Sequence, residues 1–212
     1  MIHGYYINLD TRVDRKTHIE NLKLKYPFFS NVERFEAIKN ENGAIGCSLS
    51  HIKALTELSN KNHKYYLLIE DDFFIFDDAN FNDFVKSFEE IKDNNNWDLI
   101  TLTPRGSTQT KNYINGFHKI IHTQTTTGYI VKHEFIDELL KYYKNGVIGL
   151  MRNPNNTAMP NLDALDQCWK PLQEKSNFIY FNKIYGGQLH CYSDIEKQVV
   201  DYNARFKAQI HY

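Results

Sequence analysis

The chain has little cysteine: only three residues among 212, and none of them in a CxxC pair. Cys47, Cys168 and Cys191 are far apart in the sequence. An odd number of scattered cysteines is typical of free thiols in a reducing compartment, and disulfide-stapled domains show the opposite pattern. The sequence therefore predicts a protein without disulfide bonds.

The chain also lacks long apolar segments. No run of about 18 apolar residues occurs, so we expect no transmembrane helix. The opening MIHGYYINLD has no basic segment followed by an apolar one, so no signal peptide is expected. These features predict a cytoplasmic protein, with peripheral attachment at a membrane as the alternative.

An excess of charge of either sign is missing as well. Lys and Arg number 25, Asp and Glu number 26, and the formal net charge is -1. Proteins that bind nucleic acid usually carry a clear basic excess, because their affinity comes from neutralising phosphates. We therefore expect no nucleic-acid partner, although local basic side chains can still bind the few phosphates of a small nucleotide. The phosphate-loop pattern GxxxxGK[ST] is absent too.

What is present is an alternation of strand and helix patterns with no repeat or linker between them. It predicts a single domain with an α/β sheet and helices on both faces. The first helix is expected to be capped by Asp10 or Thr11. The predicted strands are 4–8, 32–38, 65–69, 98–102, 117–122, 128–131 and 178–181. The predicted helices run from the cap to Pro27 and over 44–59, 81–91, 134–143 and 162–170.

Three consecutive acids follow the most apolar strand. Residues 65–69 (YYLLI) are typical of a central strand covered on both faces. Glu70, Asp71 and Asp72 come next, at the carboxyl end, where open α/β sheets bind ligands. Because alternate residues of an extended chain share a side, we expect Glu70 and Asp72 to converge and Asp71 to face elsewhere. Two convergent carboxylates favour a hard divalent cation, and a solvated acidic turn is the alternative.

Four motif-like stretches occur in this order: residues 7–15 (INLDTRVDR), 43–55 (GAIGCSLSHIKAL), 67–75 (LLIEDDFFI) and 193–195 (SDI). Together they resemble glycosyltransferase family 25. The family covers bacterial lipopolysaccharide galactosyltransferases and collagen hydroxylysine galactosyltransferases. Each stretch is short, and the specificity lies in their order and in their span over most of the chain. The length fits the compact bacterial or viral scale better than the collagen-type members.

The resemblance implies a GT-A type nucleotide-sugar transferase fold with a mostly parallel central sheet. It also implies a UDP-sugar donor, Mn²⁺ (or Mg²⁺) as cofactor, and inversion at the anomeric carbon. We expect one glycosyltransferase domain over 1–212, with 1–105 binding the nucleotide sugar and 106–212 forming the acceptor side and C-terminal segment. The reaction would move a hexose (galactose or glucose) to a hydroxyl of a glycan, lipooligosaccharide or glycosylated protein. Nothing in the sequence indicates the oligomeric state.

The resemblance also assigns roles to residues. Asp72 is the expected metal ligand, with Glu70 and His190 as further candidates, because a C-terminal histidine completes the metal site in several GT-A enzymes. Arg12 or Arg15 would bind a phosphate, which suits a guanidinium; a capped helix with solvated arginines is the alternative. The candidate donor-binding residues are Asn8, Asp10, Arg12, Arg15, Gly46, Ser50, His51, Glu70 and Asp71.

Inverting transfer also needs a general base for the acceptor hydroxyl, and a carboxylate is the usual choice. Asp163 and Asp166 open the predicted helix after a proline-containing loop, where the family carries an acidic residue. We assign the base role to one of these two, with Asp163 slightly favoured. Stabilising the start of that helix is their alternative role.

Two other functions are consistent with the sequence. One is a catalytically inactive, transferase-like module that binds glycan or nucleotide. The other is a different α/β enzyme, such as a nucleotidyltransferase or a Mg²⁺-dependent phosphohydrolase with Asp10 as nucleophile after the first strand. The four ordered stretches favour the transferase.

Overall fold

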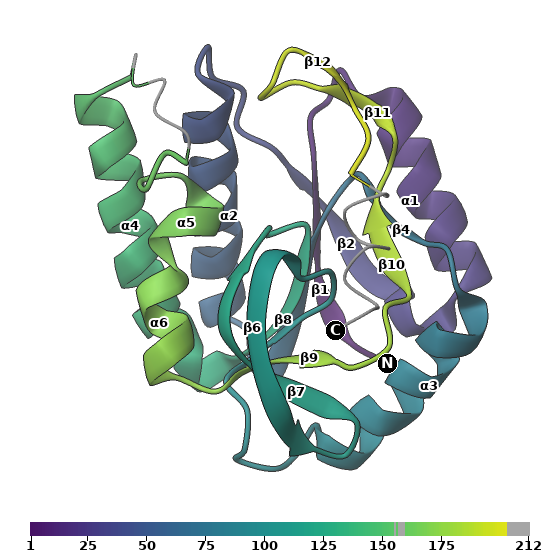
Figure 1. Ribbon diagram of the computed structural model, residues 1–212. Helices are drawn as coiled ribbons and strands as arrows, with labels where there is room; N and C mark the ends of the chain where they lie inside the picture. The colour runs from purple at the N-terminus through teal and green to yellow at the C-terminus, as the bar shows by residue number, and fades with distance from the viewer. Residues whose placement is uncertain (155, 157–159, 203–212) are drawn as a thin grey trace.

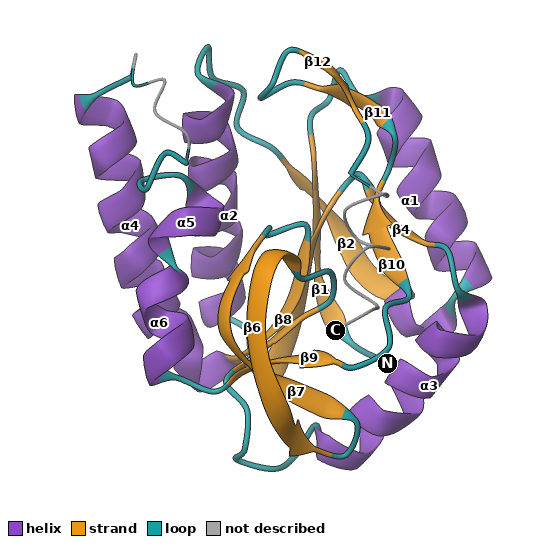
Figure 2. Cartoon of the chain, viewed as in Figure 1, coloured by secondary structure: helices purple, strands orange, loops and turns teal. Residues whose placement is uncertain are grey.

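The computed structural model describes residues 1–154, 156 and 160–202. A central sheet of eight strands is covered by helices on both faces (Figures 1 and 2). One face carries α1 (Val13–Lys25), the short 3₁₀ turn η1 (Pro27–Phe29) and α3 (Asp78–Ile91). The other face carries α2 (Gly43–Ser59), η2 (His133–Phe135), α4 (Ile136–Arg152), α5 (Leu165–Cys168) and α6 (Lys170–Lys175).

The strand order across the sheet is β2-β1-β3-β8-β5-β9-β7-β6. The pairs β1–β2, β1–β3 and β5–β9 are parallel, whereas β8 runs antiparallel to its neighbours β3 and β5, and β7 to β9 and β6. All strands except β8 and β7 therefore point the same way, which confirms the predicted α/β fold with a mostly parallel sheet. The bounds are β1 (His3–Asn8), β2 (Asn31–Glu36), β3 (Tyr65–Glu70), β5 (Leu99–Thr101), β6 (Arg105–Ile114), β7 (Phe117–Gln124), β8 (Gly128–Lys132) and β9 (Phe178–Phe181).

Alternation along the strands builds two hydrophobic cores, one on each face of the sheet. In β3, Leu67 and Ile69 pack on the side of α1 and α3, while Tyr66 and Leu68 pack on the side of α2 and α4. All four side chains are fully buried. This two-sided burial explains why β3 is apolar at every position, and it holds the carboxyl end of the strand in a fixed place.

All the predicted strands are present, but five short or irregular strands were missed. They are β6, the pair β4 (Phe73–Ile75) with β10 (Gly186–Gln188), and the pair β11 (Cys191–Ser193) with β12 (Gln198–Val200). Residues 186–188, although they include two consecutive glycines, are buried and hydrogen-bonded to β4.

Several helix boundaries also differ from the prediction. The cap of α1 is Arg12, without a side-chain bond, because Asp10 pairs with Arg34 instead. Helix α4 continues through Gly146 to Arg152, since Val147 and Leu150 bury a further turn against α2. The predicted helix 162–170 is replaced by the short α5 and by α6, which begins at Lys170; Pro171 lies in the first turn of α6, where its missing N–H is not needed.

The fold brings the carboxyl ends of β1 and β3 together, since these strands are adjacent and parallel with Ile7 opposite Glu70. Strand β8 starts at the same edge, where the N–H of Glu70 donates to the Thr127 carbonyl at 2.8 Å. Within the described ranges, none of the helices combines the length and apolarity needed to span a bilayer.

Candidate functional site

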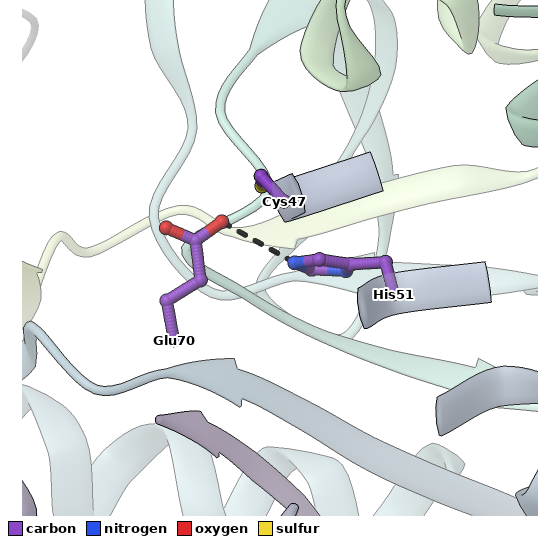
Figure 3. A group of neighbouring side chains, drawn as sticks. All are labelled: Cys47, His51 and Glu70. Atoms are coloured by element: carbon purple, nitrogen blue, oxygen red, sulfur yellow. Dashed lines mark ion pairs between the residues drawn. The ribbon is translucent and has the colours of Figure 1, made fainter. Parts of the chain in front are cut away.

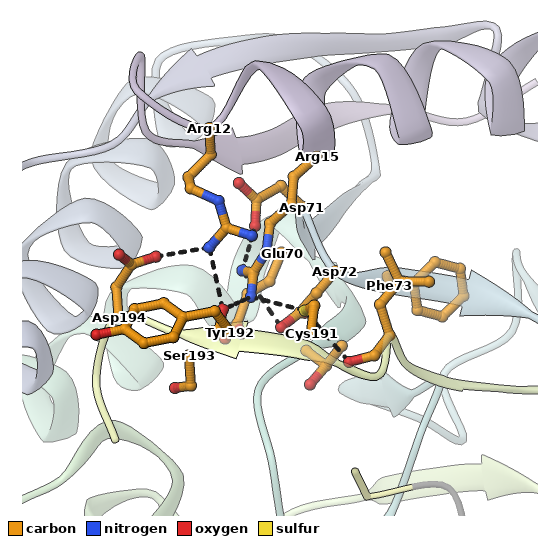
Figure 4. A network of polar contacts seen from close by, with 12 residues as sticks. Arg12, Arg15, Glu70, Asp71, Asp72, Phe73, Cys191, Tyr192, Ser193 and Asp194 are labelled. Atoms are coloured by element: carbon orange, nitrogen blue, oxygen red, sulfur yellow. Dashed lines mark hydrogen bonds and ion pairs between the residues drawn. The ribbon is translucent and has the colours of Figure 1, made fainter. Parts of the chain in front are cut away.

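The three acids after β3 point in two directions. Strand β3 ends at Glu70, and Asp71 and Asp72 form the turn into β4. One nitrogen of Arg15 lies 2.8 Å from an oxygen of Asp71 and 3.4 Å from an oxygen of Asp72 (Figure 4). Glu70 instead lies next to His51 (Figure 3). The prediction that Asp71 faces away from Asp72 was wrong, because the extended backbone on which it depended stops one residue earlier.

Asp71 is tied into the scaffold by hydrogen bonds. Its two carboxylate oxygens accept from the side-chain amide of Asn8 at 2.7 Å and from Arg15 at 2.8 Å. Asn8 in turn accepts from Arg34 at 2.9 Å. Burial raises the pKa of Asp71, although the charge of Arg15 opposes that rise. The hydrogen bonds of Asp71 with Asn8 and Arg15 therefore connect the ends of β1 and β3 with α1.

Asp72 differs from Asp71 because part of its carboxylate has no partner. The residue is only 8% exposed, and its Oδ1 is buried without a hydrogen bond among the described residues. Burial, followed by the negative charge of Glu70, raises the pKa of Asp72 to about 7 against the opposing charge of Arg15. A buried carboxylate that is surrounded by an excess of negative charge is a suitable ligand for a hard divalent cation. Asp72 therefore fits the metal-binding role expected for it.

Arg12 and Arg15 join the start of α1 to the segment 191–194. Arg15 donates to the Cys191 sulfur at 3.0 Å and to the Tyr192 carbonyl at 2.9 Å. Arg12 donates to the same carbonyl at 3.1 Å and to Asp194 at 2.8 Å (Figure 4). The fold thus gathers three of the four family-like stretches at one place. Much of the donor capacity of both guanidiniums is used inside the protein, although the buried Nε of Arg15 has no partner within the part of the chain that the structure describes.

Gly46 and Ser50 of α2 hold the connection from β2 to the helix. The Ser50 hydroxyl accepts from the Ile38 N–H at 2.8 Å and donates to the Gly46 carbonyl at 2.7 Å. A Cβ added at Gly46 would lie 2.7 Å from the Ile38 carbonyl oxygen, so only glycine permits this close approach. These contacts are with backbone, so the two residues shape the scaffold and stand apart from the acids.

His51, the next residue after Ser50 on α2, in contrast lies beside Glu70. It is fully buried, with Nε2 at 3.4 Å from Oε1 of Glu70 and Nδ1 at 3.0 Å from the Tyr129 hydroxyl. Thr126 donates to the same Glu70 oxygen at 3.0 Å. Burial alone would raise the pKa of Glu70, but its contacts with His51 and Thr126 lower it. Glu70 is therefore ionised at neutral pH.

The sequence interpretation missed Cys47 as a member of this group. Ligand atoms of Cys47, His51 and Glu70 lie within 4.8 Å of one another, with Cys47 and His51 on successive turns of α2 (Figure 3). The i, i+4 spacing of Cys47 and His51 on a predicted helix was a usable signal. What could not be read from the sequence is that this face of α2 meets the end of β3.

The remaining candidate site residues differ in their neighbours and in their exposure to solvent. Asp166 is near enough for its charge to raise the pKa of the Cys47 thiol, after burial and Glu70. Asp163 lies against α4, where a Cβ added at Gly149 would be 2.3 Å from its carboxyl carbon. His190 is exposed and follows Leu189, whose N–H donates to the Asp72 carbonyl at 2.8 Å. Asp10 is on the surface, where it pairs with Arg34.

The solved structures that match this chain have low sequence identity to it and TM-scores below 0.5. A glycosyltransferase involved in the glycosylation of the major capsid of PBCV-1 is 11% identical, with a TM-score of 0.46 over 85% of this chain and 91% of that one. An apo UDP-glucose pyrophosphorylase is 11% identical, with a TM-score of 0.45 over 94% and 76%. A mannose-1-phosphate geranyltransferase from Thermus thermophilus is 10% identical, with a TM-score of 0.42 over 84% of this chain and 58% of its own length. We draw no functional conclusion from similarities of this size.

No curated protein matches the chain. The model of glycosyltransferase family 25, described as an LPS biosynthesis protein family, matches residues 1–152. That match covers well over half of the 212 residues, and it includes β1, α2, β3 and the acids that follow β3. The chain therefore belongs to glycosyltransferase family 25 and is a glycosyltransferase.

Proposed function

We propose that the protein is a metal-dependent, inverting hexosyltransferase that moves galactose or glucose from a UDP-sugar to a hydroxyl of a glycan, lipooligosaccharide or glycosylated protein. The observation that carries the proposal is the Asp72 carboxylate, which is buried at the carboxyl end of β3 and keeps one oxygen without a hydrogen bond in residues 1–154, 156 and 160–202. The excess negative charge around Asp72 favours the binding of a cation. A diphosphate leaving group also needs a cation to stabilise its negative charge.

In this proposal Asp72 holds Mn²⁺ or Mg²⁺. His190 is the further candidate ligand, because it lies two residues after Gln188, which pairs with Phe73 next to Asp72. When bound, the cation supplies positive charge to the leaving diphosphate. Asn8 and Asp71 keep the turn that carries Asp72 rigid through their mutual hydrogen bond. Arg15 limits the repulsion between Asp71 and Asp72 and offers its Nε toward a phosphate oxygen.

The acceptor hydroxyl loses its proton to a carboxylate as its oxygen attacks the anomeric carbon from the face opposite the UDP. The new C–O bond forms while the bond to the diphosphate breaks, so the configuration inverts. Between the two candidate bases, Asp166 is supported better than Asp163, because its charge acts on Cys47 together with those of Glu70, Asp72 and Asp71. The Asp163 carboxyl group instead lies close to the backbone of α4 at Gly149.

A donor screen tests the proposal directly. Purified protein is incubated with Mn²⁺ and a panel of UDP-sugars, and released UDP is measured. We expect turnover with one UDP-hexose, lost on chelation and reduced at least about 100-fold in Asp72→Asn, since the cation and its ligand contribute several kcal/mol to the transition state. Asp93→Asn is the matched control, because Asp93 is an exposed acid paired with a surface lysine.

Two results would contradict parts of the proposal. Activity and UDP affinity that are unchanged by chelation would remove the metal role. UDP binding without turnover of any donor would favour the inactive, nucleotide-binding module. A base assignment follows from the same assay, because the true base is the one of Asp163→Asn and Asp166→Asn that loses turnover without losing UDP affinity.

A further inference from the structure

A second group of ligand atoms lies beside the acidic pair, where α2 meets the end of β3. It consists of the Cys47 thiol, the Nε2 of His51 and the carboxylate of Glu70, all within 4.8 Å of one another (Figure 3). Cys47 and His51 are four residues apart on α2, so a rigid element sets their separation. Thiolate, imidazole and carboxylate together are ligands typical of Zn²⁺, whereas Mn²⁺ and Mg²⁺ prefer oxygen alone.

The unsatisfied nitrogen of His51 points to a bound ion. His51 is fully buried, yet its Nε2 has no hydrogen-bond partner among the residues that the structure describes. A buried polar atom without a partner has lost its hydration without replacement, so native proteins rarely keep one without a purpose. The distance of 3.4 Å to Glu70 Oε1 is long for a hydrogen bond. It is close to the roughly 3.3 Å expected between nitrogen and oxygen ligands that share one tetrahedral zinc ion.

The surroundings of the three side chains already hold them in place. The Tyr129 hydroxyl contacts His51 Nδ1 at 3.0 Å, and this leaves Nε2 to face Glu70 and Cys47. Thr126 fixes the Glu70 carboxylate from the other side at 3.0 Å. Metal-binding histidines and carboxylates usually have such outer partners, which orient them before the ion arrives.

The charges nearby also favour a cation. Glu70, Asp71, Asp72 and Asp166 all act on the Cys47 thiol with negative charge. Arg15 forms ion pairs with Asp71 and Asp72, and its single positive charge also acts on Glu70, so it offsets only part of the negative charge around the group. A divalent ion that displaces the thiol proton would balance one thiolate and one carboxylate.

We propose that Cys47, His51 and Glu70 form a zinc site that links α2 to the end of β3, separate from the cation site at Asp72. The ion would fix the end of β3 against α2, and its fourth position would be left to water. This site shares Glu70 with the proposed active site but does not depend on the transfer reaction. Its test therefore needs neither a sugar nucleotide nor turnover.

Co²⁺ is the probe, because it binds at zinc sites and gives a strong thiolate-to-metal absorption band in the near ultraviolet. The full chain is stripped with chelator and titrated with Co²⁺, and Zn²⁺ is then added in competition. We expect the thiolate band at one equivalent, its complete loss in Cys47→Ala, and its displacement by Zn²⁺. Tyr129→Phe should weaken Zn²⁺ binding by about 10–100-fold, because it removes only the outer contact to His51.

Two variants serve as matched controls. Cys168→Ala removes another partly buried thiol and should keep the band, since Cys168 lies outside the group. Asp72→Asn should keep it too, which separates this site from the acidic pair. Circular dichroism of each stripped variant shows whether it is folded, and Cys47→Ser replaces Cys47→Ala if the latter is not. A band that is missing in the wild type, or that persists without Cys47, would overturn the proposal, whereas loss of turnover alone would not bear on it.

Discussion

Arg15 is the residue on which the electrostatics of the acidic turn depend. Its side chain is 11% exposed, and its guanidinium forms ion pairs with Asp71 and Asp72, whose side chains are 8% and 12% exposed. Burying two carboxylates so close together is tolerable only with a counter-charge between them. The arginine is therefore part of the scaffold that permits a cation site at this position, besides any contact it makes with a donor.

We expect Arg15→Ala to destabilise the metal-free protein by about 3–5 kcal/mol, because it leaves two buried carboxylates unpaired. Urea unfolding followed by circular dichroism measures the change. Lys64→Ala, which breaks an exposed ion pair with Asp93, is the control and should have little effect. Mn²⁺ should restore part of the stability of Arg15→Ala. Equal stability of the two variants would show that the acids do not need Arg15.

Asp72 predicts how the stability of the chelated protein varies with pH. Its pKa is about 7 when folded, against 3.8 as the ordinary value, so the folded state binds the extra proton between these limits. Unfolding then releases a proton, and the free energy of unfolding falls as pH rises from about 4 to 7, by up to roughly 1.4 kcal/mol per unit. Asp72→Asn should flatten this slope and be the more stable protein at pH 8.

Chemical unfolding of both proteins at several pH values, with chelator throughout, makes this comparison. Asp93→Asn provides the matched change at an exposed acid. Parallel pH curves for the wild type and Asp72→Asn would mean that Asp72 keeps an ordinary pKa, and the argument for a cation at that side chain would lose its electrostatic part.

At the scale of elements, helix α4 is shaped by what packs against its glycines. A Cβ at Gly149 would lie 2.3 Å from the carboxyl carbon of Asp163, and one at Gly146 would lie 2.7 Å from the Asp163 carbonyl oxygen. The segment that carries both candidate bases thus sits directly on the helix backbone. Two glycines in the last turns, which normally signal a helix end, here permit a close approach.

Gly149→Ala should therefore destabilise the protein, although glycine to alanine in a helix normally gains up to about 1 kcal/mol. Thermal unfolding measures the change, and Asn145→Ala at an exposed position of the same helix is the control, with a small gain expected. If the displaced Asp163 is not the base, Gly149→Ala keeps its turnover at temperatures where it is folded. A gain in stability would show that Asp163 does not pack on this glycine.

The sequence predicted elements better than it predicted contacts. Apolar runs such as 65–69 revealed the strands, because two-sided burial leaves a direct trace in composition. The strand Gly186–Gln188 left no such trace, since Gly186 is required by the close approach of Phe74 and Phe73. The acids after β3 were recognised as a site from their position, but their orientation depends on where the extended backbone stops. The pairing of Arg15 with Asp71 links residues 56 positions apart, and no local pattern encodes it.

At the scale of the whole molecule, a segment near each end of the described chain contributes to the surroundings of the acidic turn. The hairpin of β11 and β12 is attached to α1 through Arg12 and Arg15, while the family match covers only residues 1–152. Residues beyond the match therefore contribute directly to the surroundings of the acidic turn.

We expect Asp194→Asn to loosen this hairpin without unfolding the domain, because it removes a partly exposed ion pair with Arg12. Limited proteolysis should then cut residues 191–200 faster than in the wild type, while the melting temperature stays nearly the same. Asp83→Asn, which breaks an exposed pair with Lys183 elsewhere, should leave the cleavage rate unchanged. Equal cleavage in all three proteins would show that Arg12 does not hold the hairpin.

The bonds between α1 and the hairpin also set an order of events during biosynthesis. Arg12 and Asp194 are 182 residues apart, and Arg15 and Tyr192 are 177 apart. A ribosome releases the amino-terminal part first, so β1, α1, α2 and β3 emerge long before the segment that joins Arg12 and Arg15. A nascent chain can thus form its central strands early, but the acidic turn lacks its final neighbours until residue 194 is free. The contacts that surround the residues proposed to hold the cation are then among the late ones to form in each new molecule.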